Sequence, residues 1–252
     1  MTNRFPLITA HSGCMNTPDN SILSVETGLK LGADIVEEDV LVTRDGIPVL
    51  AHDDNWRMPN GQELKISQLT YEEITGLQLK ATREEQGHAI RLCRLEEMLL
   101  LIQASGKIAN LDLKADECIE AVAGLVHKHR MLEQIFLSGC ETERALKAQS
   151  NPELKKLLNA KSDLFLSMEY EAAVVQTCKD ALAASCFGIN INHKFVRPEL
   201  VNYASSKGLP VYVWTVNEEA LMENFVRMGV ASITTRNVAE LVRLKQRLRG
   251  SI

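Results

Sequence analysis

Short apolar segments alternate with longer amphipathic segments along this 252-residue chain. Most of the short segments are rich in β-branched or aromatic residues and have no polar face, which is typical of parallel strands buried on both sides. Eight such strands are predicted, at Leu7–Ala10, Asp34–Val42, Ile108–Leu113, Gln134–Ser138, Leu164–Met168, Gly188–Ile191, Val211–Thr215 and Ser232–Thr234.

The segments between the strands have the periodicity of helices, and several end at a glycine, which suits a helix C-terminus. The predicted helices are Asn20–Leu31, Arg94–Ala104, Asp116–Lys128, Cys140–Ala148, Tyr170–Ala183, Arg197–Lys207, Asn217–Met228 and Val238–Arg249. Alternation of strand and helix predicts an α/β fold, a closed (β/α)8 TIM barrel forming one domain over residues 1–252. An open doubly wound sheet is disfavoured because the chain has no G-x-G-x-x-G loop.

An excursion interrupts the barrel pattern between predicted strands two and three. It comprises an extra strand at Ile47–Leu50, reached through an Asp45-Gly46 turn, and the segment Asp53–Cys93. We expect the excursion on the face where the strands have their carboxyl ends, because barrel enzymes keep their active sites there.

Composition excludes some classes of protein. The net charge is -5 and no long Lys/Arg run is present, so we expect no nucleic-acid partner. No apolar run is long enough for a membrane span, and the first residues lack the apolar core of a signal peptide. Six scattered cysteines without a C-x-x-C pair predict buried thiols. Together these features favour a cytoplasmic protein.

Two carboxylates of predicted strand two share one face, because residues i and i+2 of a strand point to the same side. Glu37 and Asp39 are that pair, and Glu38 points the other way. Carboxylates aimed into a dry barrel are costly unless a cation offsets their charge. Oxygen ligands favour Mg²⁺ or Ca²⁺. The alternative is that both carboxylates face helices and form salt bridges.

The next strand repeats the spacing with Asp112 and Lys114. Asp112 can supply a third metal oxygen, and Lys114 a positive charge for an anionic substrate. His11 ends the first strand, and His52 follows the hairpin after the second. Two imidazoles across a reaction centre can act as acid and base, although either histidine alone could be a core or capping residue.

These residues give the chain a family resemblance. It resembles the glycerophosphodiester phosphodiesterases, whose motif reads His-Arg-Gly, Pro-Glu-Asn, Gly-Ala-Asp, Glu-x-Asp, Thr-x-Asp-Gly and His-Asp, followed later by Leu-Glu-Glu, Glu-x-Lys and Trp-Thr-Val-Asn. The matching residues are His11-Ser12-Gly13, Pro18-Asp19-Asn20, Gly32-Ala33-Asp34, Glu37-Glu38-Asp39, Thr43-Arg44-Asp45-Gly46, His52-Asp53, Leu95-Glu96-Glu97, Asp112-Leu113-Lys114 and Trp214-Thr215-Val216-Asn217.

The resemblance implies a barrel enzyme that hydrolyses a small glycerophosphodiester to an alcohol and glycerol 3-phosphate. It implies one divalent cation, Mg²⁺ or Ca²⁺, held by Glu37, Asp39 and Asp112. It further implies His11 and His52 as the acid–base pair, Lys114 as a phosphate contact and Trp214 as part of the glycerol or leaving-group pocket.

Four positions depart from the family pattern. Ser12 replaces the phosphate-binding Arg, Asp19 replaces Glu, Asp112 replaces Glu, and Arg236 replaces the Asp of a Thr-Asp pair. Closure of the barrel would place strand eight beside strand one, so Arg236 and Ser12 should be neighbours. We therefore assign both to substrate or phosphate binding, with Arg236 restoring the lost guanidinium contact.

Other functions are compatible with the same residues. A phospholipase D-like lyase that gives a cyclic phosphate also uses two His, Glu-x-Asp and Asp-x-Lys, which Asp112 favours. A non-catalytic phosphate-ester-binding barrel is a second alternative, although the intact His11 and His52 disfavour it. An unrelated barrel with a chance match is a third.

Overall fold

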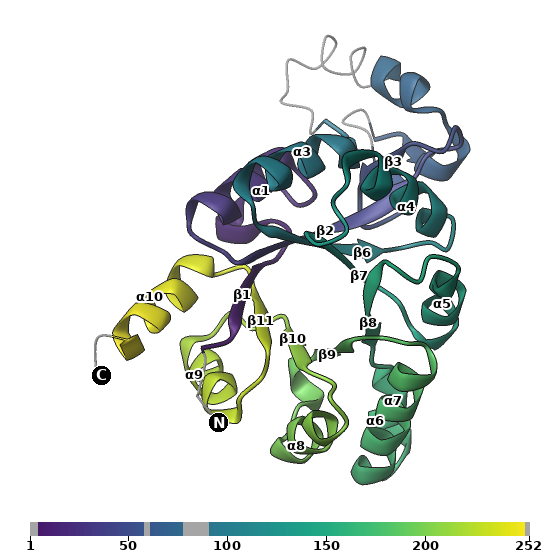
Figure 1. Ribbon diagram of the computed structural model, residues 1–252. Coiled ribbons are helices and arrows are strands. Elements are labelled where there is room, and N and C mark those ends of the chain that lie inside the picture. Colours follow the sequence, from purple (N-terminus) through teal and green to yellow (C-terminus); the bar gives the residue numbers. More distant parts are fainter. Residues whose placement is uncertain (1–4, 58–60, 78–90, 250–252) are drawn as a thin grey trace.

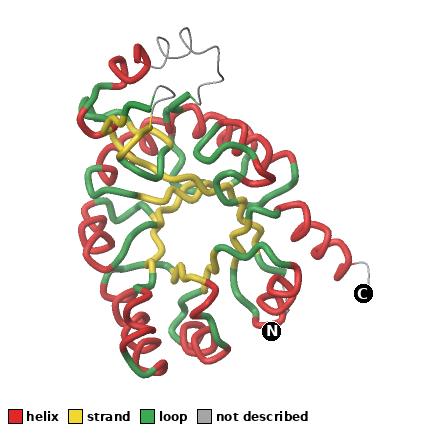
Figure 2. Tube along the Cα trace, turned by 180° about the vertical axis from the view of Figure 1, so that it is seen from behind, coloured by secondary structure: helices red, strands yellow, loops and turns green. Residues whose placement is uncertain are grey.

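The protein is a closed barrel of eight parallel strands surrounded by helices (Figure 1), seen as a ring in Figure 2. The structure, a computed structural model, describes residues 5–57, 61–77 and 91–249. The barrel strands are β1 (Leu7–Ala10), β2 (Ile35–Val42), β6 (Ile108–Leu113), β7 (Ile135–Ser138), β8 (Lys155–Asn159), β9 (Gly188–Asn192), β10 (Val211–Trp214) and β11 (Ser232–Thr235). Because β1 pairs with both β2 and β11, the barrel closes. The prediction of a TIM barrel is confirmed.

Helices cover the outside of the barrel. In the described residues they are α1 (Ile22–Lys30), α3 (Leu95–Ser105), α4 (Cys118–His129), α5 (Thr142–Lys147), α6 (Ser162–Ser167), α7 (Tyr170–Ala183), α8 (Pro198–Ser206), α9 (Glu219–Met228) and α10 (Val238–Arg249). Their apolar faces pack on the outward side chains of the strands in one large core. A smaller core fills the inside of the barrel with Ile35, Phe136, Leu157 and Tyr212.

One predicted strand is wrong. Leu164–Met168 does not form a strand, because residues Ser162–Ser167 form helix α6. There the ring of Phe165 lies 5.6 Å from those of Tyr170 and Phe195, a cluster outside the sheet. The fifth barrel strand is β8, which begins with two lysines and offers only Leu157 and Leu158 as an apolar signal.

The predicted excursion is present between β2 and β6. Strand β3 (Pro48–Leu50) pairs antiparallel with β2, and β4 (Asn55–Arg57) pairs antiparallel with β5 (Glu63–Lys65). It has a small core of its own, formed by Leu41, Val49, Ala51, Ile66, Ile74 and Leu92. The part of the prediction that covers residues 58–60 and 78–90 lies outside the described residues.

Strand register aligns the polar residues of neighbouring strands. Glu37 of β2 pairs with Asn110 of β6, and Asp39 pairs with Asp112. Partners in a parallel pair that point to the same side lie next to each other. The register therefore places acidic and amide side chains together at the carboxyl ends of the strands.

Two expectations from composition can be compared with the structure. All six cysteines are unpaired and buried, as predicted. No helix among the described residues has the length and apolar character needed to cross a membrane.

Candidate active site

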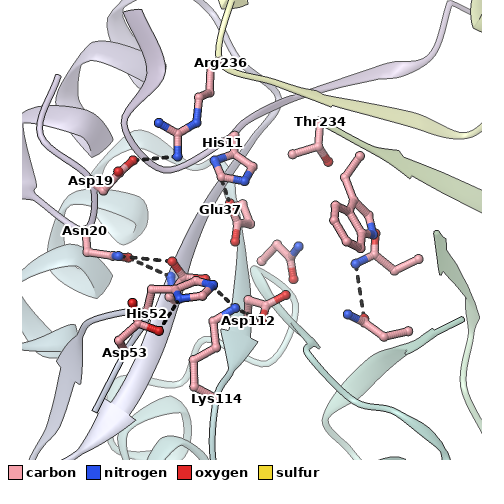
Figure 3. Close-up of a pocket in the computed structure, with 15 residues that line it drawn as sticks. His11, Asp19, Asn20, Glu37, His52, Asp53, Asp112, Lys114, Thr234 and Arg236 are labelled. Atoms are coloured by element: carbon pink, nitrogen blue, oxygen red, sulfur yellow. Dashed lines mark hydrogen bonds and ion pairs between the residues drawn. The ribbon is translucent and has the colours of Figure 1, made fainter. Parts of the chain in front are cut away.

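A cavity of about 430 Å³ opens where the barrel strands end (Figure 3). Residues from every barrel strand except β7, or from the loops that follow those strands, line it. The lining residues are His11, Asp19, Asn20, Glu37, Asp39, His52, Asp53, Asn110, Asp112, Lys114, Asn159, Asn190, Trp214, Thr234 and Arg236. The cavity thus brings together all the site residues expected from the sequence except Ser12.

The alternation along β2 separates its three acidic residues as predicted. Glu37 and Asp39 line the cavity, whereas Glu38 is fully buried on the other side of the strand. Neither carboxylate of the inward pair turns toward the helices, so the alternative of surface salt bridges does not apply to them.

Lys114 lies between two of the cavity carboxylates. Its Nζ is 2.8 Å from both Asp39 Oδ1 and Asp112 Oδ1. Burial opposes the charge of Lys114, but the two carboxylates outweigh it and raise the pKa of Lys114 above its ordinary value. The Ser138 hydroxyl donates to Asp112 Oδ2 at 2.9 Å. Both carboxylate oxygens of Asp112 are therefore engaged, one by Lys114 and one by Ser138.

The negative charge of Glu37 has fewer stabilising contacts than that of Asp112. Its Oε2 accepts a hydrogen bond from the Ser12 N–H at 3.2 Å. Burial, followed by the charges of Asp39 and Asp112, raises the pKa of Glu37 well above its ordinary value. The site therefore has more negative charge than its own cations neutralise.

Asn20 clamps Asp39 from the side of the first loop. The Asp39 N–H donates to Asn20 Oδ1 at 3.0 Å, and Asn20 Nδ2 donates to Asp39 Oδ2 at 3.1 Å. Both oxygens of Asp39 are thus engaged, one by Asn20 and one by Lys114.

The tautomer of His11 follows from its neighbour. His11 Nδ1 lies 2.8 Å from the carbonyl oxygen of Ser12, and a carbonyl can only accept, so Nδ1 carries the proton. Nε2 is then free to accept a proton. Burial lowers the pKa of His11 below its ordinary value, and the charge of Arg236 adds to this effect. The lowered pKa favours the neutral form of His11.

His52 faces the cavity from the excursion. It follows Ala51, the first residue after β3, and the Ala51 N–H donates to the Asp39 carbonyl at 3.1 Å. Its Nδ1 lies 3.0 Å from Asp53 Oδ1, so a carboxylate orients the ring. His52 is largely exposed, in contrast to His11.

Arg236 follows β11 and lies beside the loop after β1, as predicted from barrel closure. The Met15 N–H donates to the Arg236 carbonyl at 2.8 Å, which ties the two segments together. Its Nη2 is 2.8 Å from Asp19 Oδ1, and both residues line the cavity. A guanidinium therefore lies at the edge of the cavity, near the position where the family pattern has its Arg.

Ser12 lies behind the cavity wall. Its hydroxyl donates to Glu38 Oε2 at 2.7 Å and accepts from the Asn20 N–H at 2.7 Å. Its side chain does not line the cavity, so a direct contact with phosphate stays a prediction. Burial raises the pKa of Glu38 to about 8, while hydrogen bonds from the Ser12 and Ser24 side chains act in the opposite direction.

Amide side chains line the rest of the cavity, and two of them, Asn110 and Asn159, were missed from the sequence. Asn190 Nδ2 donates to Asn159 Oδ1 at 3.2 Å, whereas Asn110 Oδ1 and Trp214 Nε1 are buried without a partner. Asn110 could have been found, because it stands two residues before Asp112 on the same face of its strand. Asn159 was lost with the wrong fifth strand.

Comparisons with known proteins agree with this geometry. The sequence model of the Glycerophosphoryl diester phosphodiesterase family matches residues 11–240. A glycerophosphodiester phosphodiesterase of Caldanaerobacter subterraneus is 26% identical over 239 residues, which cover 94% of this chain and 97% of that protein. A glycerophosphodiester phosphodiesterase of Bacillus altitudinis is 26% identical over 247 residues, covering 96% of this chain and 99% of that protein.

A solved structure has the same fold. The phosphodiesterase of Oleispira antarctica, solved in complex with the product sn-glycerol-3-phosphate, superimposes with a TM-score of 0.78 at 20% identity, covering 96% of this chain and 97% of that one. The expected family and the expected phosphodiesterase class are confirmed. On the family match and on the residues gathered in its cavity, the chain is a phosphodiester hydrolase and belongs to the glycerophosphoryl diester phosphodiesterase family.

Proposed function

We propose that this enzyme hydrolyses a glycerophosphodiester to an alcohol and glycerol 3-phosphate with the help of one divalent cation. One observation carries the proposal: two histidines, five carboxylates and two basic side chains line a single cavity at the mouth of the barrel. The product found in the Oleispira antarctica structure supports the same reaction.

The charges of the cavity suit a divalent cation. Glu37, Asp39 and Asp112 supply only oxygen ligands, which Mg²⁺ and Ca²⁺ prefer. The raised pKa of Glu37 indicates that this cluster needs more positive charge than Lys114 provides. Among the described residues, no three His, Cys, Asp or Glu side chains are arranged as the ligands of one ion, and Lys114 Nζ lies between two of the carboxylates.

We therefore expect Lys114 to turn away from Asp39 or Asp112 when the cation binds, leaving the three carboxylates to hold it. The bound cation would supply Lewis-acid stabilisation of a phosphoryl oxygen. The released ammonium would then be available to a second phosphoryl oxygen.

We assign the role of base to His11 and the role of acid to His52. His11 carries its proton on Nδ1, so Nε2 can take the proton of the attacking oxygen, from water or from the 2-hydroxyl of the substrate. If the 2-hydroxyl attacks, the product of this step is a cyclic phosphate, and a water molecule must then open it to give glycerol 3-phosphate. The new P–O bond forms as the bond to the departing alcohol breaks. His52, oriented by Asp53, protonates that alcohol.

The phosphoryl oxygens gain negative charge in the transition state, and basic side chains stabilise it. Lys114 and Arg236 both line the cavity and are placed for this role. Trp214 lines the same cavity and would contact the glycerol or the leaving group.

A substrate screen tests the proposal. Glycerophosphodiesters with different alcohols would be incubated with Mg²⁺, Ca²⁺ or Mn²⁺, and glycerol 3-phosphate measured, with His11→Ala and His52→Ala as inactive controls. We expect turnover that depends on the cation. A cyclic phosphate as the final product, seen by ³¹P NMR, would identify the lyase instead. Saturable binding without turnover of any diester would identify a non-catalytic barrel.

A further inference from the structure

A continuous path of hydrogen bonds joins the back of strand β2 to the cavity. Glu38 accepts from the Ser12 hydroxyl at 2.7 Å, and the same hydroxyl accepts from the Asn20 N–H at 2.7 Å. The Asn20 side chain then makes its two bonds to Asp39. The path begins and ends on neighbouring parts of one strand, but it passes through the loop after β1.

The path is costly to maintain. Ser12 is 1% exposed and Glu38 is 0% exposed, and the hydroxyls of Ser12 and Ser24 are the hydrogen-bond donors that act on the Glu38 carboxyl. Burying an acidic side chain that is only partly hydrogen-bonded lowers stability. Asn20 has a φ of 55°, a left-handed conformation that most residues with a side chain avoid. If these side chains only filled space, apolar residues in their place would give a more stable protein. The path therefore points to a requirement for the position of Asn20.

We propose that Ser12 and Glu38 are positioning residues for the reaction: they hold Asn20 so that its amide fixes the Asp39 carboxylate in the cavity. This inference rests on the proposed function, because Asp39 is one of the three acidic groups of that site. It gives Ser12 a role that does not require contact with the phosphate. Asn20, which lines the cavity, is the link between the two buried residues and the chemistry.

Removal of the Ser12 hydroxyl is the first test. Ser12→Ala should lower kcat about tenfold, because a small displacement of a catalytic carboxylate is expensive in rate. The matched control is Ser232→Ala. Its hydroxyl is equally buried and also has two hydrogen-bond partners, Thr9 and the Leu7 carbonyl, but it lies at the other end of the barrel. The control should keep kcat within about twofold.

Coupling to Asn20 separates positioning from a general loss of stability. If Ser12 acts through Asn20, Ser12→Ala should lower kcat no further in an Asn20→Ala background. Glu38→Gln keeps an oxygen that can accept from Ser12 and should retain kcat within about threefold, whereas Glu38→Leu should match Ser12→Ala. The inference is overturned by equal losses in Ser12→Ala and Ser232→Ala, by additive losses in the double variant, or by full kcat in Glu38→Leu.

A second measurement does not depend on turnover. The backbone N–H proton of Asn20 should exchange with solvent at least about tenfold faster in Ser12→Ala than in the wild type. Ser232→Ala should leave this exchange rate unchanged. If the wild type hydrolyses no diester, the proposed function fails while this measurement still tests the hydrogen-bonded path. If exchange at Asn20 does not respond to Ser12→Ala, the path is overturned even in an active enzyme.

Discussion

Arg236 Nη2 lies 2.8 Å from Asp19 Oδ1, so a residue after the last barrel strand is paired with a residue in the loop after the first. Both side chains are about half exposed and both line the cavity. A guanidinium held in this way can turn toward a phosphate with little loss of conformational freedom, because Asp19 already restricts it.

Arg236→Ala should therefore lower kcat/KM about tenfold to a hundredfold, the range expected when a charge-assisted hydrogen bond to substrate is lost. Arg236→Lys should recover only part of this loss, since an ammonium lacks the two parallel donors of a guanidinium. Arg243→Ala is the control, because Arg243 is an exposed arginine paired with Glu240 on helix α10. Steady-state kinetics that show no difference between Arg236→Ala and Arg243→Ala would contradict the role of Arg236.

The pH dependence of kcat/KM should report the charges around His11. Burial lowers the pKa of His11, Arg236 lowers it further, and Asp19 raises it. As the base must be unprotonated, activity should rise with pH through a value below about 6.5, the ordinary pKa of histidine. Removing the positive charge in Arg236→Ala stabilises the imidazolium, so the rise of kcat/KM with pH (the acid limb of the profile) should move to higher pH.

Asp19→Asn is the opposite change and serves as the matched comparison. It removes a negative charge that favours the imidazolium, so the acid limb should move to lower pH. Profiles from about pH 5 to about pH 9 at one fixed cation concentration would measure both shifts. Shifts in the same direction for the two variants would argue against His11 as the titrating base.

Cation binding should be visible as thermal stabilisation. A ligand at about a hundred times its Kd stabilises the folded state by about 2.7 kcal/mol, and each kcal/mol raises Tm by about 2 to 4 °C in a chain of this size. Mg²⁺ or Ca²⁺ should produce such a rise in Tm in the wild type. The same rise should occur in Glu38→Gln, because the Glu38 side chain faces away from the cavity.

Glu37→Gln should abolish this shift. Since burial and the charges of Asp39 and Asp112 raise the pKa of Glu37, its ionised form is destabilising at neutral pH, and the Gln variant should be at least as stable as the cation-free wild type. The loss of the shift would then not reflect misfolding. A cation-induced rise in Tm that survives in Glu37→Gln would place the ion elsewhere.

Gly13 should tolerate no side chain. A Cβ at this position would overlap Asp19 Oδ1 and lie 3.0 Å from Arg236 Nη1, and its φ is +71°. Gly13→Ala should therefore lower both stability and kcat/KM. Gly208→Ala is the control, because Gly208 has a φ of +74° with open space around it. Both variants bear the backbone cost of about 1–2 kcal/mol. Equal activity in the two would show that the Asp19–Arg236 pair does not matter for the reaction.

Strand periodicity predicted most of the barrel because the strands are buried on both sides and nearly all apolar. The fifth strand escaped for a physical reason. In β8, Lys155 reaches solvent and pairs with Glu133, so the apolar signal shrinks to two leucines. The more apolar run around Phe165 packs against the rings of Tyr170, at the start of α7, and of Phe195, a tertiary contact that no local pattern contains.

The part of the site that depends on the alternation along β2 and on the order of the barrel strands could be predicted from the sequence. The i, i+2 rule separated Glu37 and Asp39 from Glu38, and barrel closure placed Arg236 near the first loop. The partners of these residues were not predictable. The sequence offered Asn20 as the start of a helix and as part of a family motif, but not as a partner of Asp39. Its side chain reaches Asp39 because a left-handed turn redirects the chain. The position of Lys114 between two carboxylates likewise depends on the register of β2 and β6.

The hairpin that carries His52 has an evolutionary consequence. Val40 pairs with Leu50 across β2 and β3, and the turn between them is closed by the Thr43 N–H and the Ile47 carbonyl. A slip of one residue in this pairing would rotate every following side chain to the opposite face and carry the imidazole out of the cavity. Changes of length should thus be excluded from the turn and collect beyond Asp53. The outer excursion is then free to diversify while the imidazole keeps its place.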